Sequence, residues 1–125
     1  MGMEKAKILV VEDHGDTVEL LQMQLKQIGY PHVLVATDGV DALNKALEEK
    51  PQVILMDISL PLMNGFEAAQ KLKADPRTRP IPILAVTAKA MPGDRERCLE
   101  SGCNAYLAKP VSRQELKDEI EKLLA

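Results

Sequence analysis

The chain has 125 residues, of which 46% are hydrophobic and 28% are charged. These values are typical of one globular domain that folds without disulfides. The formal net charge is -3, and no basic cluster offsets it, so we expect no direct binding to nucleic acid. No apolar run approaches membrane-spanning length and no signal peptide is visible, so we expect no membrane association and a cytoplasmic location.

We expect residues 1–125 to form a single domain, because no repeat, low-complexity tract or linker interrupts the chain. Met1 and Gly2 stand before a second methionine. Such a pair is typical of residues added in cloning, with Met3 as the natural start. Cys98 and Cys103 fit no zinc-site spacing, and we expect both to be plain thiols.

Five short apolar runs alternate with five helix-like stretches. The runs are Lys7–Val11, Val33–Ala36, Val53–Met56, Ile83–Val86 and Ala105–Leu107. Three of them are continuously apolar rather than alternating, a pattern typical of parallel strands that are covered on both faces. The alternation predicts an α/β fold: a five-stranded parallel sheet with right-handed crossovers and helices on both faces.

The helix-like stretches carry their own start and stop signals. In chain order, the predicted start signals are Asp16 with Glu19, Asp38, Asn64 with Glu67, Pro92, and Ser112 with Glu115. Short polar side chains cap the first turn of a helix, and proline fits within that turn. Gly29 and Gly102 are the predicted C-terminal glycines of the first and fourth helices.

Polar side chains follow the predicted strands at the points where the strands end. Glu12 and Asp13 follow the first run, Asp57 the third and Thr87 the fourth, and Lys109 comes two residues after the fifth. The carboxyl ends of parallel strands meet at one edge of a sheet, where ligands bind, so we expect these side chains to converge. A carboxylate at the end of a buried strand is costly without such partners.

The converging residue types indicate phosphoryl chemistry. Three acidic side chains in a small volume repel one another, and a hard divalent cation relieves that repulsion. Mg²⁺ fits because it binds carboxylate, water and phosphate oxygens, and Mn²⁺ is an expected substitute. Thr87 and Lys109 suit an anion instead, since they offer a hydroxyl group and a compact positive charge. Asp57 is then the candidate nucleophile.

The motifs ILVVED, VILMDISLPLMNG, ILAVTA and AYLAKPV resemble the receiver domain of two-component response regulators, the CheY-like family. The resemblance runs from about Lys7 to Ala125 with every element in order. Its style is that of receivers from hybrid histidine kinases and stand-alone phosphorelay regulators. It implies a flavodoxin-like (βα)5 fold with strand order 2-1-3-4-5. It also implies a signal-transduction phosphoprotein that catalyses only its own phosphorylation and dephosphorylation, rather than an enzyme acting on a separate substrate.

The resemblance implies a role for each residue at the predicted edge. Asp57 accepts a phosphoryl group from a phosphohistidine on a sensor histidine kinase or a histidine phosphotransfer protein. Asp13, Asp57 and the backbone carbonyl of Ser59 bind Mg²⁺, and Glu12 contributes through water. These assignments are carried over from the family, position by position.

The resemblance also implies how the phosphoryl group is bound and sensed. Thr87, Ala88 and Lys109 bind it, and the small side chain of Ala88 leaves it accessible. Thr87 moves toward it and Tyr106 repacks, which changes the surface of the fourth helix, fifth strand and fifth helix for a downstream protein target. A cis peptide bond is expected before Pro110.

Simpler interpretations stay open at this point. Asp57 is alternatively a structural acid bound to Lys109, and Tyr106 a packing residue. His14 is interpreted as a loop residue rather than a proton-transfer group. Two other functions remain: a receiver-like interaction module that acts without phosphorylation, and a dehalogenase-type phosphatase. The phosphatase is disfavoured because it needs a second aspartate two positions after the nucleophile, where this chain has Ser59.

Overall fold

The computed structural model describes residues 6–60, 63–87 and 92–125, so Met1 and Gly2 lie outside the described residues. Within these ranges, five strands alternate with five helices. The strands are β1 (Lys7–Val11), β2 (His32–Ala36), β3 (Val53–Asp57), β4 (Ile83–Thr87) and β5 (Ala105–Ala108). The helices are α1 (Gly15–Gln27), α2 (Gly39–Glu49), α3 (Gly65–Ala74), α4 (Asp94–Glu100) and α5 (Arg113–Leu124).

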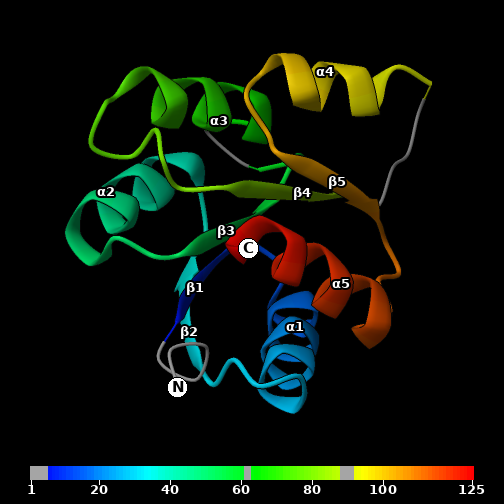
Figure 1. The fold of residues 1–125 in the computed structure, drawn as a ribbon. Coiled ribbons are helices and arrows are strands. Elements are labelled where there is room, and N and C mark those ends of the chain that lie inside the picture. Colours follow the sequence, from blue (N-terminus) through cyan, green and yellow to red (C-terminus); the bar gives the residue numbers. More distant parts are fainter. Residues whose placement is uncertain (1–5, 61–62, 88–91) are drawn as a thin grey trace.

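The strands form one parallel sheet in the order β2-β1-β3-β4-β5 (Figure 1). The predicted fold class and strand order are therefore confirmed. Val11 lies opposite Met56 in the register of β1 on β3, so the next residues along, Glu12 and Asp57, are neighbours. On the other side, Asp57 itself lies opposite Val86 of β4. The sheet thus brings residues far apart in sequence to one edge.

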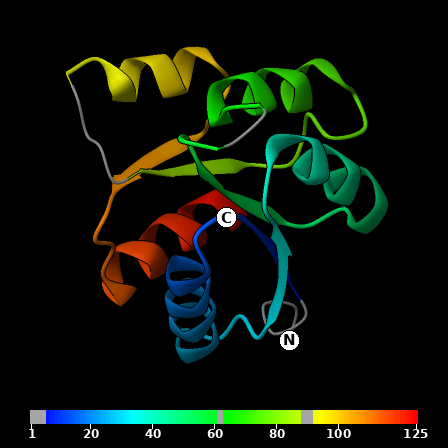
Figure 2. The ribbon, with the colours of Figure 1, turned by 180° about the vertical axis from the view of Figure 1, so that it is seen from behind.

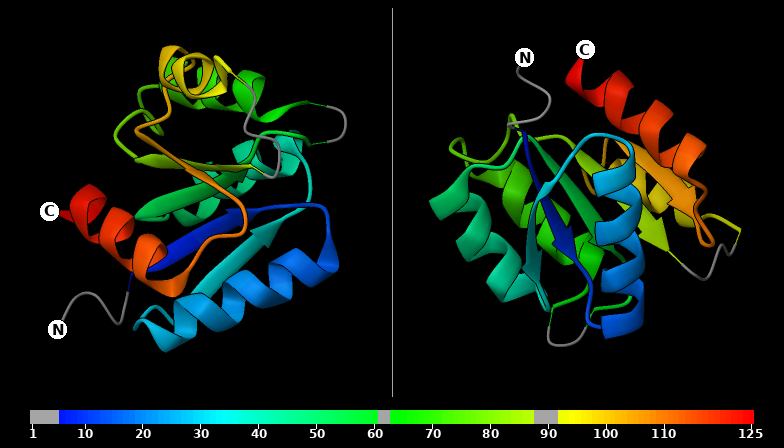
Figure 3. Two further views of the ribbon diagram at one scale, coloured as in Figure 1. Left: turned by 90° about the vertical axis from the view of Figure 1, so that its right-hand side faces the viewer. Right: turned by 90° about the horizontal axis from the view of Figure 1, so that it is seen from below.

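Side chains of the central strands alternate between two apolar layers. Leu9 and Ile54 belong to a core that is completed by α2, α3 and α4. Ile8 and Leu55 belong to the opposite core, completed by α1 and α5. Figures 2 and 3 show these helices on the two sides of the sheet. Burying each large aliphatic side chain stabilises the fold by roughly 1.5–3 kcal/mol. The central strands, whose side chains are buried in both layers, therefore contribute strongly to the stability of the fold.

Three of the predicted helix starts are confirmed by side-chain caps. Asp38 accepts a hydrogen bond from the amide of Asp41 at the start of α2. Asn64 accepts one from the amide of Glu67 at the start of α3. Ser112 forms a complete capping box with residue 115 at the start of α5. Each cap satisfies an amide that the first helical turn leaves without a partner.

Two predicted helix starts are wrong. The helix α1 begins at Gly15, because the amide of Val18 donates to the carbonyl of His14, so Asp16 lies inside the first turn rather than capping it. Its carboxylate there still complements the positive end of the helix dipole. Pro92 lies before α4 rather than in its first turn, because Gly93 takes a left-handed conformation (φ 90°) between them.

The C-terminal glycines are found where they were predicted. Gly29 and Gly102 have φ values of 103° and 105°, a conformation that side chains with a Cβ rarely adopt. Both cysteines are buried free thiols, as predicted. Among the described residues, no helix is both long enough and apolar enough to cross a membrane.

The strands β3 and β4 reach one residue further than the apolar runs indicate. Asp57 and Thr87 are the last residues of these strands rather than the residues after them. Their backbones stay in the sheet because each has a partner on the next strand: Asp57 lies opposite Val86, and Thr87 opposite Ala108. Both side chains therefore stand on a rigid backbone.

Candidate functional site

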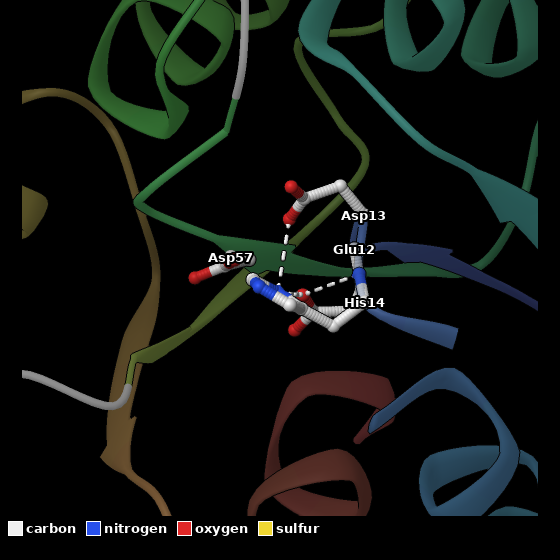
Figure 4. Close-up of side chains that lie close together, drawn as sticks. All are labelled: Glu12, Asp13, His14 and Asp57. Atoms are coloured by element: carbon white, nitrogen blue, oxygen red, sulfur yellow. Dashed lines mark hydrogen bonds and ion pairs between the residues drawn. The ribbon is translucent and has the colours of Figure 1, made fainter. Parts of the chain in front are cut away.

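Four chemically active side chains meet at the carboxyl ends of β1 and β3 (Figure 4). We call Glu12, Asp13, His14 and Asp57 the β1–β3 cluster; one oxygen or nitrogen atom of each lies within 4.8 Å of those of the other three. Glu12 and Asp57 are buried, with exposed fractions of 1% and 6%. Asp13 and His14 are exposed. Two carboxylates of the cluster are thus buried, and its other two side chains are exposed to solvent.

The backbone explains how the acids of β1 divide between the interior and the surface. The amide of Glu12 donates to the carbonyl of Ala36 at 2.9 Å, which extends the pairing of β1 with β2 by one residue and keeps the Glu12 side chain inside. The chain then leaves the sheet, and Asp13 becomes exposed. On β3, the amide of Ser59 donates to Oδ1 of Asp57 at 3.3 Å.

Lys109 offsets part of the negative charge of the two buried carboxylates. Its Nζ donates to Oε1 of Glu12 at 2.5 Å, and its side chain is 19% exposed. The backbone amide of Lys109 donates to the carbonyl of Thr87 at 2.7 Å, which ties this lysine to the end of β4. The peptide bond from Lys109 to Pro110 is cis. The hydrogen-bonded partner of Lys109 is therefore Glu12, rather than Asp57 as in the structural alternative.

The two buried carboxyl groups have opposite pKa shifts. Burial raises the pKa of Asp57 above its ordinary value, and the charge of Glu12 raises it further, against the opposing charge of Lys109. Burial also acts to raise the pKa of Glu12, but hydrogen bonds from Lys109 and His14 outweigh it, and that pKa lies below its ordinary value. The negative charge of Asp57 is thus less well balanced by hydrogen bonds and nearby positive charge than that of Glu12.

The predicted residues Thr87 of β4 and Tyr106 of β5 lie on one face of the sheet. Thr87 is buried at the end of β4. Tyr106 lies opposite Ala85 and packs, partly buried, against the core that contains α2, α3 and α4. Because Thr87 lies opposite Ala108, two residues beyond Tyr106, the two side chains share a face of the sheet. Ala88 and Lys89 lie outside the described residues.

The sequence interpretation left His14 as a loop residue near the site, whereas the structure puts its ring in the cluster. Its Nδ1 is 3.0 Å from Oε2 of Glu12 and 3.2 Å from Oδ1 of Asp13. Its pKa is raised by the hydrogen bond with Glu12 and by the charge of Asp13. The available signal is its place directly after Asp13, but sequence position alone does not tell where the ring turns.

The cluster has the donor chemistry of a site for a hard divalent cation. Glu12, Asp13 and Asp57 supply carboxylate oxygens, which are the ligands that Mg²⁺ prefers. Two of these carboxylates are buried side by side, and burial together with the charge of Glu12 raises the pKa of Asp57. The residues therefore fit a Mg²⁺ ion.

Comparison with known proteins agrees with the fold. Residues 8–121 match the response regulator receiver domain family. The chain belongs to this family, and it is a signalling domain of the kind that acts in two-component and phosphorelay systems.

Among its relatives is the polar-differentiation response regulator DivK of Brucella anthropi, which is 39% identical over 117 residues. The aligned residues cover 94% of this chain and 94% of that protein. The receiver domain of the sensor histidine kinase PA1611 from Pseudomonas aeruginosa is 38% identical, with a TM-score of 0.88 over 95% of this chain and 97% of that one. That structure has a magnesium ion coordinated in its active-site cleft. The chemotaxis response regulator CheY4 of Vibrio cholerae is 29% identical, with a TM-score of 0.86 over 95% of this chain and 98% of that one.

Proposed function

We propose that the protein is a phosphoacceptor and that Asp57 takes a phosphoryl group from a phosphohistidine. The donor is a sensor histidine kinase or a histidine phosphotransfer protein. The observation that supports this proposal best is the environment of Asp57: a buried carboxylate with a raised pKa, grouped with two further acids at the edge where Lys109 arrives. Buried acids with shifted pKa values at a strand end are typical of functional sites.

The proposed transfer exchanges one bond to phosphorus for another. An oxygen of Asp57 attacks the phosphorus, and the bond between phosphorus and the histidine nitrogen breaks. That nitrogen leaves with the electron pair and takes up a proton, and an acyl phosphate remains on Asp57. Lys109 then shares its positive charge between Glu12 and the phosphoryl oxygens, and Thr87 donates its hydroxyl hydrogen to them.

We propose Mg²⁺ as the resident cation. Asp13, Asp57 and the backbone carbonyl of Ser59 would hold it, and Glu12 would act through water. When bound, the ion neutralises the negative charges of the carboxylates and of the phosphoryl oxygens. Mn²⁺ is expected to substitute, because carboxylate, carbonyl and water oxygens suit both ions. The oxygen donors of the cluster and the magnesium in the PA1611 receiver structure support this proposal.

The first prediction is a single labile phosphoryl adduct at Asp57. Wild-type protein is incubated with acetyl phosphate, with and without Mg²⁺, and its intact mass is measured. We expect one adduct with Mg²⁺, a large loss of it without the ion, and none in Asp57→Asn. The exposed Asp118 on α5 provides a matched control, because Asp118→Asn is expected to behave as wild type. An adduct of equal yield in Asp57→Asn, or no adduct in wild type, contradicts the proposal, and the latter result favours an interaction module.

We further propose that the phosphoryl group shifts the domain between two conformations that differ at the surface of α4, β5 and α5. Thr87 and Tyr106 share one face of neighbouring strands, so a movement of Thr87 toward the phosphoryl group opens space toward Tyr106. Tyr106 is partly exposed and lies on the edge strand β5. A downstream protein target is expected to read the changed surface.

The second prediction separates phosphorylation from this response. In Thr87→Ala, we expect Asp57 still to be phosphorylated, because the nucleophile is intact, while the amide NMR shifts of α4, β5 and α5 caused by phosphorylation fall to a minor fraction of those in wild type. Thr37, exposed after β2, supplies the control variant Thr37→Ala with a full response. A full response in Thr87→Ala means that the signal takes another route.

The remaining proposals follow from the same assignment. The domain catalyses only its own phosphorylation and dephosphorylation. Residues 1–125 act as one receiver domain in the cytoplasm, where buried thiols such as Cys98 and Cys103 stay reduced. With a net charge of -3, the domain is expected to bind proteins rather than nucleic acid or membranes.

A further inference from the structure

His14 points an aromatic nitrogen into a cluster that otherwise offers only oxygen atoms (Figure 4). It is the N-cap residue of α1, yet its side chain makes no capping hydrogen bond. Its Nδ1 instead lies 3.0 Å from Oε2 of Glu12 and 3.2 Å from Oδ1 of Asp13. Its backbone amide also donates to Glu12 Oε2, at 3.2 Å, which holds the start of the helix against the cluster.

These separations are those of hydrogen-bonded or ion-paired atoms, and two ligands of one metal ion lie equally close. Two ligands at about 2.1 Å from an octahedral ion, at right angles, are about 3.0 Å apart. Two ligands at the same distance from a tetrahedral ion are roughly 3.4 Å apart. The two Nδ1–oxygen distances fall in this interval, and the corresponding atom of Asp57 lies within 4.8 Å of all the others. One nitrogen and three carboxylates therefore lie together in a cluster of the size that holds one metal ion.

The nitrogen matters because it changes which ions the site prefers. Mg²⁺ keeps oxygen ligands and gains little from imidazole. Zn²⁺ and its neighbours among the divalent transition metals bind imidazole nitrogen together with carboxylate oxygen readily. A site with Glu12, Asp13 and Asp57 alone has no nitrogen with which to favour such ions.

We propose that His14 is an additional ligand for a borderline divalent metal ion of the Zn²⁺ class, at the site where the proposed function places Mg²⁺. The inference rests on the proposed function for the position of the metal site and is independent of phosphoryl transfer. In the structure Nδ1 faces two carboxylates and therefore carries a hydrogen, which it gives up to solvent when it binds the ion, so that the ligating ring is neutral with its hydrogen on Nε2. A Zn²⁺ ion held there engages the Asp57 carboxylate and competes with Mg²⁺, so this receiver is expected to be blocked by Zn²⁺.

The first test compares two metals and three proteins. Affinities for Zn²⁺ and Mg²⁺ are measured at neutral pH by calorimetry on metal-free wild type, His14→Gln and His32→Gln. His32, exposed at the start of β2 and therefore at the opposite edge of the sheet, is the matched control. We expect His14→Gln to weaken Zn²⁺ binding roughly 10–100-fold, the loss typical of removing a group that supports a metal site, and to change Mg²⁺ binding less than about twofold. Equal Zn²⁺ affinity in wild type and His14→Gln, or an equal loss for both metals, overturns the proposal.

The second test observes the two imidazole rings directly. The chain has only two histidines, so ¹⁵N-histidine labelling gives one pair of ring nitrogens for each. On addition of Zn²⁺ we expect the Nδ1 signal of His14 to move and the signals of His32 to stay in place. The cysteines do not compete for the ion, because both are buried. Zn²⁺ held by Glu12 and Asp13 alone would disturb the neighbouring ring of His14 without ligating it, so an Nδ1 signal that does not take the position of a metal-bound nitrogen also overturns the proposal.

The two proposals fail separately. A Zn²⁺-dependent shift of His14 with no acetyl phosphate adduct overturns the phosphoacceptor function and leaves the metal inference standing. A normal adduct together with His14 signals that Zn²⁺ does not move overturns the metal inference and leaves the phosphoacceptor function standing. If both proposals hold, Zn²⁺ is expected to block phosphorylation of the wild type, and His14→Gln is expected to relieve that block.

Discussion

A methyl group at Gly65 is expected to lower the free energy of unfolding by about 1–3 kcal/mol, the usual penalty for overpacking, and to reduce phosphorylation at the same time. Gly65 is the first residue of α3 and is buried against the end of β3. A Cβ there would lie 2.5 Å from the carbonyl oxygen of Asp57 and 2.7 Å from the Cα of Ile58. These are backbone atoms, which cannot rotate away as a side chain can.

Gly15→Ala is the matched control for Gly65→Ala. Gly15 is likewise the first residue of a helix that follows a central strand, but a Cβ at this position would meet nothing within 4 Å. Alanine there is expected to leave stability unchanged or raise it by roughly 0.4–1 kcal/mol, since it restricts the unfolded chain. Urea denaturation and the acetyl phosphate assay on both variants check the contrast. Equal effects at the two positions would mean that close approach to Asp57 is not the cause.

Removing the charge of Lys109 is expected to have the largest effect on stability. In Lys109→Met the buried carboxylate of Glu12 loses the ammonium group that lies 2.5 Å from it. Breaking a buried ion pair from one side costs roughly 3–5 kcal/mol, and we expect about 3 kcal/mol because the lysine side chain is 19% exposed. The exposed Lys117 of α5 supplies the control Lys117→Met, with little change in the midpoint of urea denaturation.

The pH dependence of Lys109→Met identifies the cause of its instability. In wild type the pKa of Glu12 is lowered, so its contribution to stability is present above the unfolded pKa and is lost as the pH falls through the folded one. Without Lys109, burial and Asp57 are expected to raise that pKa, so the variant regains stability by binding a proton as the pH falls. The difference between the two proteins should thus be larger at about pH 7 than at about pH 5. A difference independent of pH would mean lost packing of the lysine stem instead.

Added Mg²⁺ gives an independent measure of the same effect. An ion that binds the folded state at 100 times its Kd stabilises it by about 2.7 kcal/mol. In wild type the ion competes with Lys109 for the charge of Glu12, whereas in Lys109→Met it does not. Mg²⁺ is therefore expected to raise the midpoint of urea denaturation more in the variant than in wild type.

The fold could be predicted from sequence because its signals are local or repeat with a simple period. Buried parallel strands are continuously apolar, so every strand was found within a residue or so at its ends. Helix starts were right where a side chain makes the cap, as at Asp38 and Ser112. They were wrong at Asp16 and Pro92, where the start depends on a backbone hydrogen bond to His14 or on the conformation of Gly93.

The convergence of the acids could be predicted from topology, but their pairing could not. Residues at the carboxyl ends of adjacent parallel strands meet whatever their side-chain torsions are, which is why Glu12, Asp13 and Asp57 were expected together. That Lys109 and the exposed ring of His14 both turn toward Glu12 depends on rotamers and charges in three dimensions. No spacing in the sequence carries this information.

The register of β1 on β3 restricts how domains of this kind can diverge. Val11 opposite Met56 puts one buried acid beside the other, while alternate residues of the same strands fill two separate apolar layers. Inserting one residue within either strand would exchange the layers and part the acids in a single event. The loops at the opposite edge of the sheet, which carry none of the candidate site residues, have no such restriction. Descendants of this chain are therefore free to vary those loops in length and composition, while strand length stays constant.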